Sequence, residues 1–164
     1  LKCPEDEIYF VEDDYLHHPR CLFEMVDSYQ YFQNKMRQLN PQAEIAIMPV
    51  DNFFHYLDNA MFSSPVVLGR FRHWRVNYYS NWTLLLSKKG LRDNWSNWWK
   101  FSDYDLKKPE THEDATLTPI FKNAITLFTP IPSLALHVAS PSYESPFTNW
   151  REIWSAVDRG WEER

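Results

Sequence analysis

Short apolar runs alternate along the chain with longer stretches in which apolar residues recur every three or four positions. A short apolar run bounded by polar or turn-forming residues predicts a buried strand. We therefore expect strands at 7–11, 45–50, 66–68, 82–87, 125–128 and 134–138. Pro130 and Pro132 are expected to break the strand that begins at 125, because proline cannot donate a hydrogen bond to a neighbouring strand.

The longer stretches predict amphipathic helices. From Leu22 to Leu39 apolar side chains recur at helical spacing, with Pro19 before the stretch and Asn40-Pro41 after it. This spacing predicts one long helix with a buried apolar face. Shorter helices are expected at 91–101, after the acidic residues that follow Thr111, and at 147–157.

Strands and helices in alternation predict one α/β domain that spans residues 1–164, with no internal repeat or low-complexity linker. The apolar run at 8–11 stops abruptly at Glu12-Asp13-Asp14, as a buried parallel strand does at the carboxyl edge of its sheet. In open α/β sheets, ligands bind in the crevice beyond that edge. We therefore expect these carboxylates to lie in a ligand-binding crevice.

Composition excludes several functional classes. The 164 residues contain 17 Lys and Arg against 22 Asp and Glu, and the resulting net charge of −5 argues against a nucleic-acid binder. With 3 glycines the chain has no glycine-rich phosphate loop. No apolar stretch approaches the ~20 residues that a membrane-spanning helix needs, so we expect no transmembrane segment.

Two cysteines, Cys3 and Cys21, are too few for a disulfide scaffold or a thiolate zinc site, although they leave room for one bridge. Their small number favours a reducing compartment. We therefore expect a cytoplasmic protein, either soluble or peripheral at the cytoplasmic face of the membrane. The first residue is Leu1 rather than Met, which suggests a piece of a longer protein.

The three adjacent carboxylates of Glu12, Asp13 and Asp14 repel one another, and a cation is the simplest compensation for keeping them ionised at a sheet edge. Oxygen ligands of this kind select Mg²⁺ or Mn²⁺, which commonly bridge carboxylates to substrate phosphates. A solvated turn, or acidic residues ahead of a helix, explains the same pattern equally well.

A second acidic pair, Glu113-Asp114, follows His112 at a predicted helix start, where either carboxylate could serve as a general base or simply stabilise the helix end. The sequence has no second histidine four residues after His112, so it does not match a zinc metalloprotease motif. His137 lies in an apolar run. A lone histidine there is more often a hydrogen-bonded core residue than a metal ligand.

Aromatic and basic residues are mixed in His73-Trp74-Arg75. An arginine can clamp a phosphate or carboxylate while an indole stacks on a sugar or base, but an edge strand with extended arginines is equally consistent. The tryptophans at 95, 98 and 99 are expected to pack in the core or in a lid rather than to bind ligand.

Taken in order, these motifs resemble the nucleotide-sugar glycosyltransferases of the GT-A class, in particular the family-2-like bacterial and viral members. The resemblance extends over nearly the whole chain. The segments that carry it are Val11 to His17, Val50-Asp51, His73-Trp74-Arg75 with Ser80 to Thr83, His112-Glu113-Asp114, and Ile131 to His137 with Ser140-Pro141. It implies a GT-A-like, Rossmann-like mixed sheet flanked by helices.

The resemblance also implies roles for individual residues. Glu12-Asp13-Asp14 corresponds to the acidic DXD-type motif, so Asp14, assisted by Glu12 or Asp13, would hold Mn²⁺ or Mg²⁺ against the donor diphosphate. His137 corresponds to the late histidine that completes the metal site. The remaining assignments are a catalytic base at Asp114, preferred over Glu113, and donor or acceptor contacts from Asp13, Asp51, His73 and Arg75.

Two features depart from the family pattern. The acidic motif is Glu-Asp-Asp rather than a strict DXD. The chain also begins almost at that motif, so the first βαβ units, which hold the base and ribose of the nucleotide, are not matched here. We therefore expect this sequence to be the later part of such a domain, completed by a preceding half or by an oligomeric partner.

The leading prediction is a metal-dependent glycosyltransferase, inverting at the anomeric carbon, with a nucleotide-sugar donor and a carbohydrate or related acceptor. A carbohydrate-binding module, in which exposed tryptophans stack on sugars without turnover, is the first alternative. A phosphoesterase that uses the acidic clusters with two metals is the second.

Overall fold

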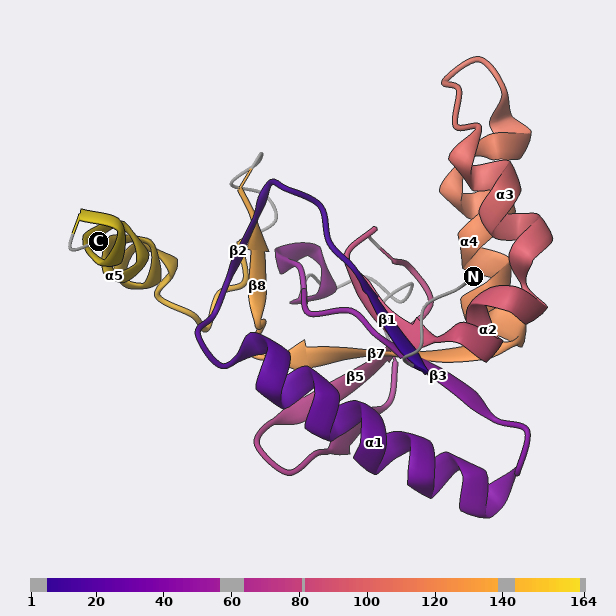
Figure 1. Cartoon of the computed structure of the whole chain (residues 1–164), viewed down its shortest axis with the longest axis horizontal. Helices are drawn as coiled ribbons and strands as arrows, with labels where there is room; N and C mark the ends of the chain where they lie inside the picture. The colour runs from indigo at the N-terminus through magenta and orange to yellow at the C-terminus, as the bar shows by residue number, and fades with distance from the viewer. Residues whose placement is uncertain (1–5, 57–63, 81, 139–143, 163–164) are drawn as a thin grey trace.

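The computed structural model describes residues 6–56, 64–80, 82–138 and 144–162 of the chain. It is an α/β structure in which helices flank a mixed six-stranded sheet (Figure 1). The strand order is β1-β6-β3-β7-β5-β4. The strands are β1 (Glu7–Phe10), β3 (Glu44–Ile47), β4 (Val66–Leu68), β5 (His73–Asn77), β6 (Leu84–Ser87) and β7 (Ile125–Ile131).

Only β3 and β7 pair in parallel, with Ile45 opposite Thr126 in the register. The other neighbours are antiparallel: β1 with β6, β6 with β3, β7 with β5, and β5 with β4. Since β1 and β3 both run opposite to β6, strands β1, β3 and β7 point the same way. Their carboxyl ends therefore lie at one edge of the sheet.

Helix α1 (Cys21–Leu39) covers one face of the sheet, as Figure 1 shows. Alternate side chains of the central strands point toward it, because successive residues of a strand face opposite sides. The buried cluster on this face contains Cys21, Met25, Tyr29 and Phe32 of α1 with Ile45, Ile47, Trp74, Leu85, Phe128 and Leu134.

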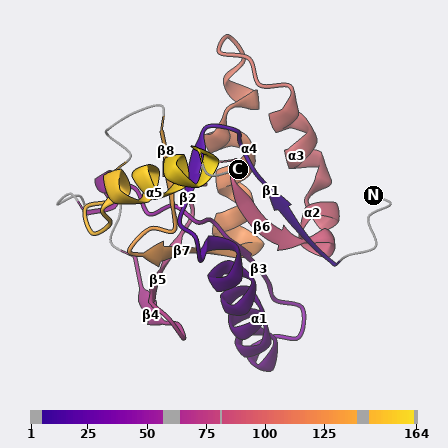
Figure 2. The same ribbon diagram turned by 60° about the vertical axis from the view of Figure 1, so that its left-hand side comes forward.

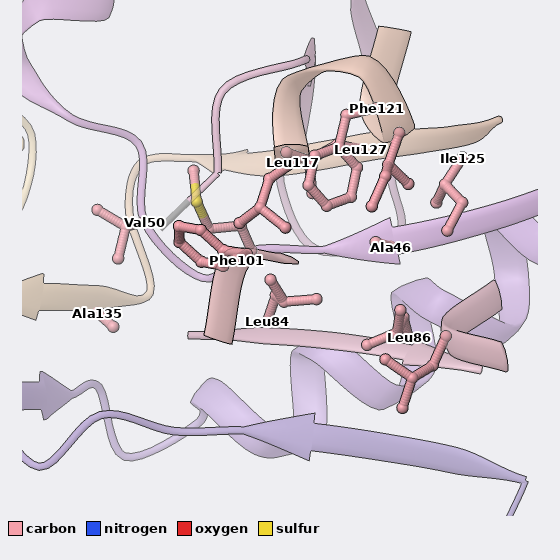
Figure 3. Packing of buried hydrophobic residues seen from close by; sticks show 13 residues of the cluster. Ala46, Val50, Leu84, Leu86, Phe101, Leu117, Phe121, Ile125, Leu127 and Ala135 are labelled. Carbon is pink, nitrogen blue, oxygen red and sulfur yellow. The ribbon is translucent and has the colours of Figure 1, made fainter. Parts of the chain in front are cut away.

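Helices α2 (Lys88–Asp93), α3 (Trp95–Ser102) and α4 (Glu113–Asn123) follow on the other side. Figure 3 shows Phe101, Leu117 and Phe121 of α3 and α4 against Leu84, Leu86 and Leu127 of the sheet. The central strands β3 and β6 are thus buried on both faces, which explains the apolar runs Ile45 to Ile47 and Leu84 to Leu86 in the sequence.

A separate two-stranded ribbon lies beyond the carboxyl edge of the sheet. Strand β2 (Tyr15–His17) pairs antiparallel with β8 (Ala135–His137), and the last helix, α5 (Trp150–Glu162), lies beside this ribbon in both views (Figures 1 and 2). Within the described part of the chain, no helix is both long and apolar enough to cross a bilayer.

The predicted elements are present, with three corrections. Strand β1 is not a buried parallel strand: it is an edge strand antiparallel to β6, and the Phe10 side chain is 38% exposed. Strand β7 continues through Pro130 to Ile131, because beyond Phe128 it has a strand partner on one side only. The helix expected at 91–101 is divided at Asn94 into α2 and α3.

Candidate active site

Three segments that are distant in the sequence meet at the carboxyl edge of the sheet. The turn after β1 carries Glu12, Asp13 and Asp14, the first turn of α4 carries Glu113 and Asp114, and β8 carries His137. The charges of Glu12 and His137, and those of Glu12 and Glu113, are close enough to act on each other. The structure therefore brings together the two acidic motifs and the late histidine.

Backbone hydrogen bonds fix the acidic turn between the sheet and the ribbon. The Glu12 N–H donates to the hydroxyl oxygen of Thr83 at 3.1 Å, just before β6. The Val138 N–H donates to the carbonyl oxygen of Asp14 at 2.9 Å. The turn is thus tied on one side to β6 and on the other to the end of β8.

Asp14 and His137 are direct neighbours across the ribbon. The Asp14 Oδ2 and His137 Nε2 atoms are 2.8 Å apart. The ring of Tyr15, opposite His137 in the β2–β8 register, lies 5.0 Å from the imidazole centroid. The expected proximity of Asp14 and His137 is confirmed, whereas a shared metal ion stays a prediction.

Burial and neighbouring negative charge raise the pKa values of Glu12 and Glu113. Burial raises the pKa of Glu12, and the negative charge of Asp14 adds to that effect. Burial, followed by the charges of Asp114 and Glu12, raises the pKa of Glu113 to about 7. Negative charge is therefore concentrated here in partly buried surroundings, the arrangement that a bound cation would relieve.

The donor set fits a hard divalent ion that shares its coordination with substrate. The Asp14 Oδ1 atom is buried and makes no hydrogen bond with any residue that the structure describes, whereas the Oδ2 atom contacts His137. Among the described residues, no three histidine, cysteine, aspartate or glutamate side chains converge on one metal position. Mg²⁺ and Mn²⁺ tolerate such a site, because water and phosphate oxygens complete their coordination.

Asp51 and Arg75 form a second network that starts at the end of β3. The Asp51 side chain is fully buried, and the Arg75 Nε atom donates to its Oδ1 at 3.1 Å. Tyr56, in the short helix Phe53–Tyr56, donates its hydroxyl to Asp51 Oδ2. Both carboxylate oxygens are thus already engaged by the protein.

This second network also holds the base of β8. The Asp51 N–H donates to the Ser133 hydroxyl at 3.0 Å, and the Leu134 and Ala135 N–H groups donate to the Pro49 carbonyl oxygen. His137 follows two residues after Ala135. Asp51 and Arg75 therefore help to position the strand that carries His137, and Asp51 presents no free surface to a ligand.

His73 and Asp13 lie outside these contacts. His73 is exposed at the carboxyl edge, opposite Ile131 in the register, and Asp13 is exposed at the tip of the acidic turn. The first turn of α4 supports both interpretations of Glu113 and Asp114, since both lie in the acidic first turn and Glu113 is close enough to Glu12 for their charges to interact.

Several residues that shape the site were not identified from the sequence. Thr83 is 71 positions from its partner Glu12, and no local pattern indicates that pairing. Tyr15 directly follows the acidic motif in the sequence, but its contacts with Glu12 and His137 form only because β2 pairs with β8. Ser133 could have been suspected from its place between Pro132 and the predicted strand.

Comparison of the chain with protein-family models, with curated proteins and with solved structures finds no match. Any functional assignment therefore depends on the motifs and on the geometry of this site.

Proposed function

We propose that this chain supplies the metal-binding and catalytic part of a glycosyltransferase that moves a sugar from a nucleotide-sugar to a carbohydrate acceptor. One observation carries the proposal: Asp14, with a buried oxygen that makes no hydrogen bond within the described residues, lies 2.8 Å from His137 and near the carboxylates of Glu12 and Glu113. The order of the motifs and the α/β architecture support it.

Asp14 and His137 would hold Mn²⁺ or Mg²⁺, which when bound neutralises the diphosphate leaving group of the donor. Asp114 is exposed in the first turn of α4, where an acceptor arriving from solvent can reach it. In the proposed reaction Asp114 takes the proton of the acceptor hydroxyl. That oxygen bonds to the anomeric carbon while the bond from this carbon to the diphosphate oxygen breaks, with inversion.

The carboxyl group of Glu113 is the alternative base. Its pKa of about 7 suits proton transfer at neutral pH, but its side chain is less exposed than that of Asp114 and lies near Glu12. We assign Glu113 the smaller role because the acceptor arrives from solvent. We assign Asp51 and Arg75 to positioning of β8, since the Arg75 guanidinium is already committed to the Asp51 carboxylate.

The test is release of nucleoside diphosphate by the full 164-residue chain, with Mn²⁺ and a panel of UDP-, GDP- and dTDP-sugars at millimolar concentration. Because the proposed site holds only the diphosphate of the donor, through the metal at Asp14 and His137, we expect a KM for the donor at or above roughly 1 mM, near −4 kcal/mol of binding. EDTA should abolish release. Asp114→Asn should lower turnover by on the order of 10² or more, and the exposed Asp103→Asn should not.

Turnover that survives EDTA, or Asp114→Asn at wild-type rate, would overturn the assignment of the metal or of the base. Failure to release nucleoside diphosphate from every donor would overturn the glycosyltransferase proposal as a whole. Hydrolysis of a simple phosphoester such as p-nitrophenyl phosphate with two equivalents of metal would instead favour the phosphoesterase.

A further inference from the structure

A groove of about 690 Å³ opens beside the candidate site, between the β2–β8 ribbon and α5. His137 belongs to its wall, so the groove is continuous with the Asp14–His137 pair. Figures 1 and 2 both place α5 beside the ribbon. The volume is within the range of about 300–1,000 Å³ that is typical of small-molecule sites.

The walls of the groove combine aromatic surface with hydrogen-bonding groups. Trp150 and Trp154 of α5 lie across from apolar residues of the ribbon, and the indole of Trp154 is 55% exposed. Arg151, Ser155 and Glu144 add a cation, a hydroxyl and a carboxylate. A sugar ring matches both features, because its C–H face stacks on an indole while its hydroxyls both donate and accept hydrogen bonds.

One polar atom in the wall lacks a partner. The Trp150 side chain is only 3% exposed, yet its Nε1–H makes no hydrogen bond with the described residues. Buried indole N–H groups usually find an acceptor. The Nε1 atom of Trp150 is closed to solvent, so Trp150 packs beneath the groove, and Trp154 is the indole that a ligand can reach.

We propose that this groove is the acceptor subsite, and that it binds a pyranose ring of a carbohydrate acceptor stacked on Trp154, with the sugar hydroxyls hydrogen-bonded to Arg151 and Glu144. The role of the groove as an acceptor subsite rests on the proposed glycosyl transfer. Carbohydrate binding in the groove does not depend on that function. The carboxylate of Glu144 makes the groove less suited to a phosphate headgroup than to a neutral sugar.

The experiment is saturation-transfer NMR on the full chain in EDTA, with cellobiose, maltose, lactose, chitobiose and mannobiose as probes. EDTA removes any contribution from a metal-bound donor. At least one disaccharide should bind in the millimolar range, and Trp154→Ala should weaken that binding at least tenfold. The matched control is Trp99→Ala on α3, whose indole is 65% exposed and lies outside the groove, and it should bind as the wild type does.

Failure of all five disaccharides to bind, or binding that is unaffected by Trp154→Ala, overturns this inference. Its outcome is separable from that of the proposed function. Disaccharide binding without nucleotide-sugar turnover would support the carbohydrate site and overturn the glycosyltransferase proposal. Turnover with an acceptor KM that is unchanged in Trp154→Ala would support the glycosyltransferase and overturn the carbohydrate site.

Discussion

Carboxylates occur in two contrasting settings in this protein. Glu24, Glu44 and Asp51 are each less than 9% exposed, and each is paired with at least one arginine side chain. The partner atoms lie between 2.6 and 3.1 Å away, in Arg72, Arg37 and Arg75 respectively. These buried charges are compensated within the protein itself.

Within the described residues, no arginine or lysine is paired with the carboxylates of the acidic turn or of the first turn of α4. Glu12 and Glu113 face other carboxylates, and His137, which acts on Glu12, carries charge only when protonated. Since proteins normally pair buried charge, this imbalance supports the proposal that a metal ion binds here. The first setting stabilises the fold, and the second is the place where we propose that the ion binds.

The largest expected effect comes from breaking a compensated pair. Arg75→Met leaves the fully buried Asp51 carboxylate without its cation, and should lower the free energy of unfolding by about 3–5 kcal/mol. Urea denaturation measures the loss. Arg92→Met is the matched control, because Arg92 is 74% exposed and pairs only at the surface with Asp93, so its change should stay within about 0.5 kcal/mol.

The acidic cluster should respond to metal where the compensated pairs do not. With free Mn²⁺ at about 100 times its dissociation constant, linkage raises the free energy of unfolding by about 2.7 kcal/mol. For a chain of this length that corresponds to a rise in Tm of roughly 5–10 °C. Asp14→Asn should abolish the rise. An equal Mn²⁺ shift in that variant would show that the ion binds elsewhere.

Removing negative charge from the cluster should stabilise the protein above neutral pH. Folding raises the pKa of Glu113 from 4.5 to about 7, so its contribution favours the folded state fully below about pH 4.5 and is lost as the pH rises through 7. Glu113→Gln is neutral at every pH and should gain about 2 kcal/mol at pH 8 without metal. The exposed Glu110→Gln serves as control, and thermal melts from pH 4 to 8 measure both.

Local patterns predicted most of the elements because periodicity is a local property. The helix expected from Leu22 to Leu39 is present as α1, yet Leu22 and Val26 are 59% and 46% exposed, while Glu24 is buried. The inward position of Glu24 depends on Arg72, which lies 48 residues away at the start of β5. No window of sequence that covers one helix contains that information.

Strand order could not be predicted from the sequence, because it too depends on contacts between distant segments. The run at 8–11 has the composition of a buried strand, but its place at the edge of the sheet follows from which later strand pairs with it. For the site, the order of the motifs predicted that Asp14 and His137 would meet. The raised pKa of Glu113 could not be foreseen, because its main cause is burial and a further cause is the charge of Glu12, 101 positions earlier, and both arise only in the folded chain.

Two buried threonines, one beside the acidic turn and one beside Asp51, allow a small change to be compared between the two settings. Thr83 accepts a hydrogen bond from the Glu12 N–H, and Thr129 donates a longer one, at 3.4 Å, to the Asp51 carboxylate. Both side chains are 0% exposed, so replacing either with valine keeps the shape and removes one hydroxyl at a cost of about 1 kcal/mol. Thr83→Val should also weaken Mn²⁺ binding several-fold by loosening the acidic turn, whereas Thr129→Val should leave it unchanged. Urea denaturation with and without Mn²⁺ compares the variants, and equal Mn²⁺ affinities would mean that the turn keeps its geometry without Thr83.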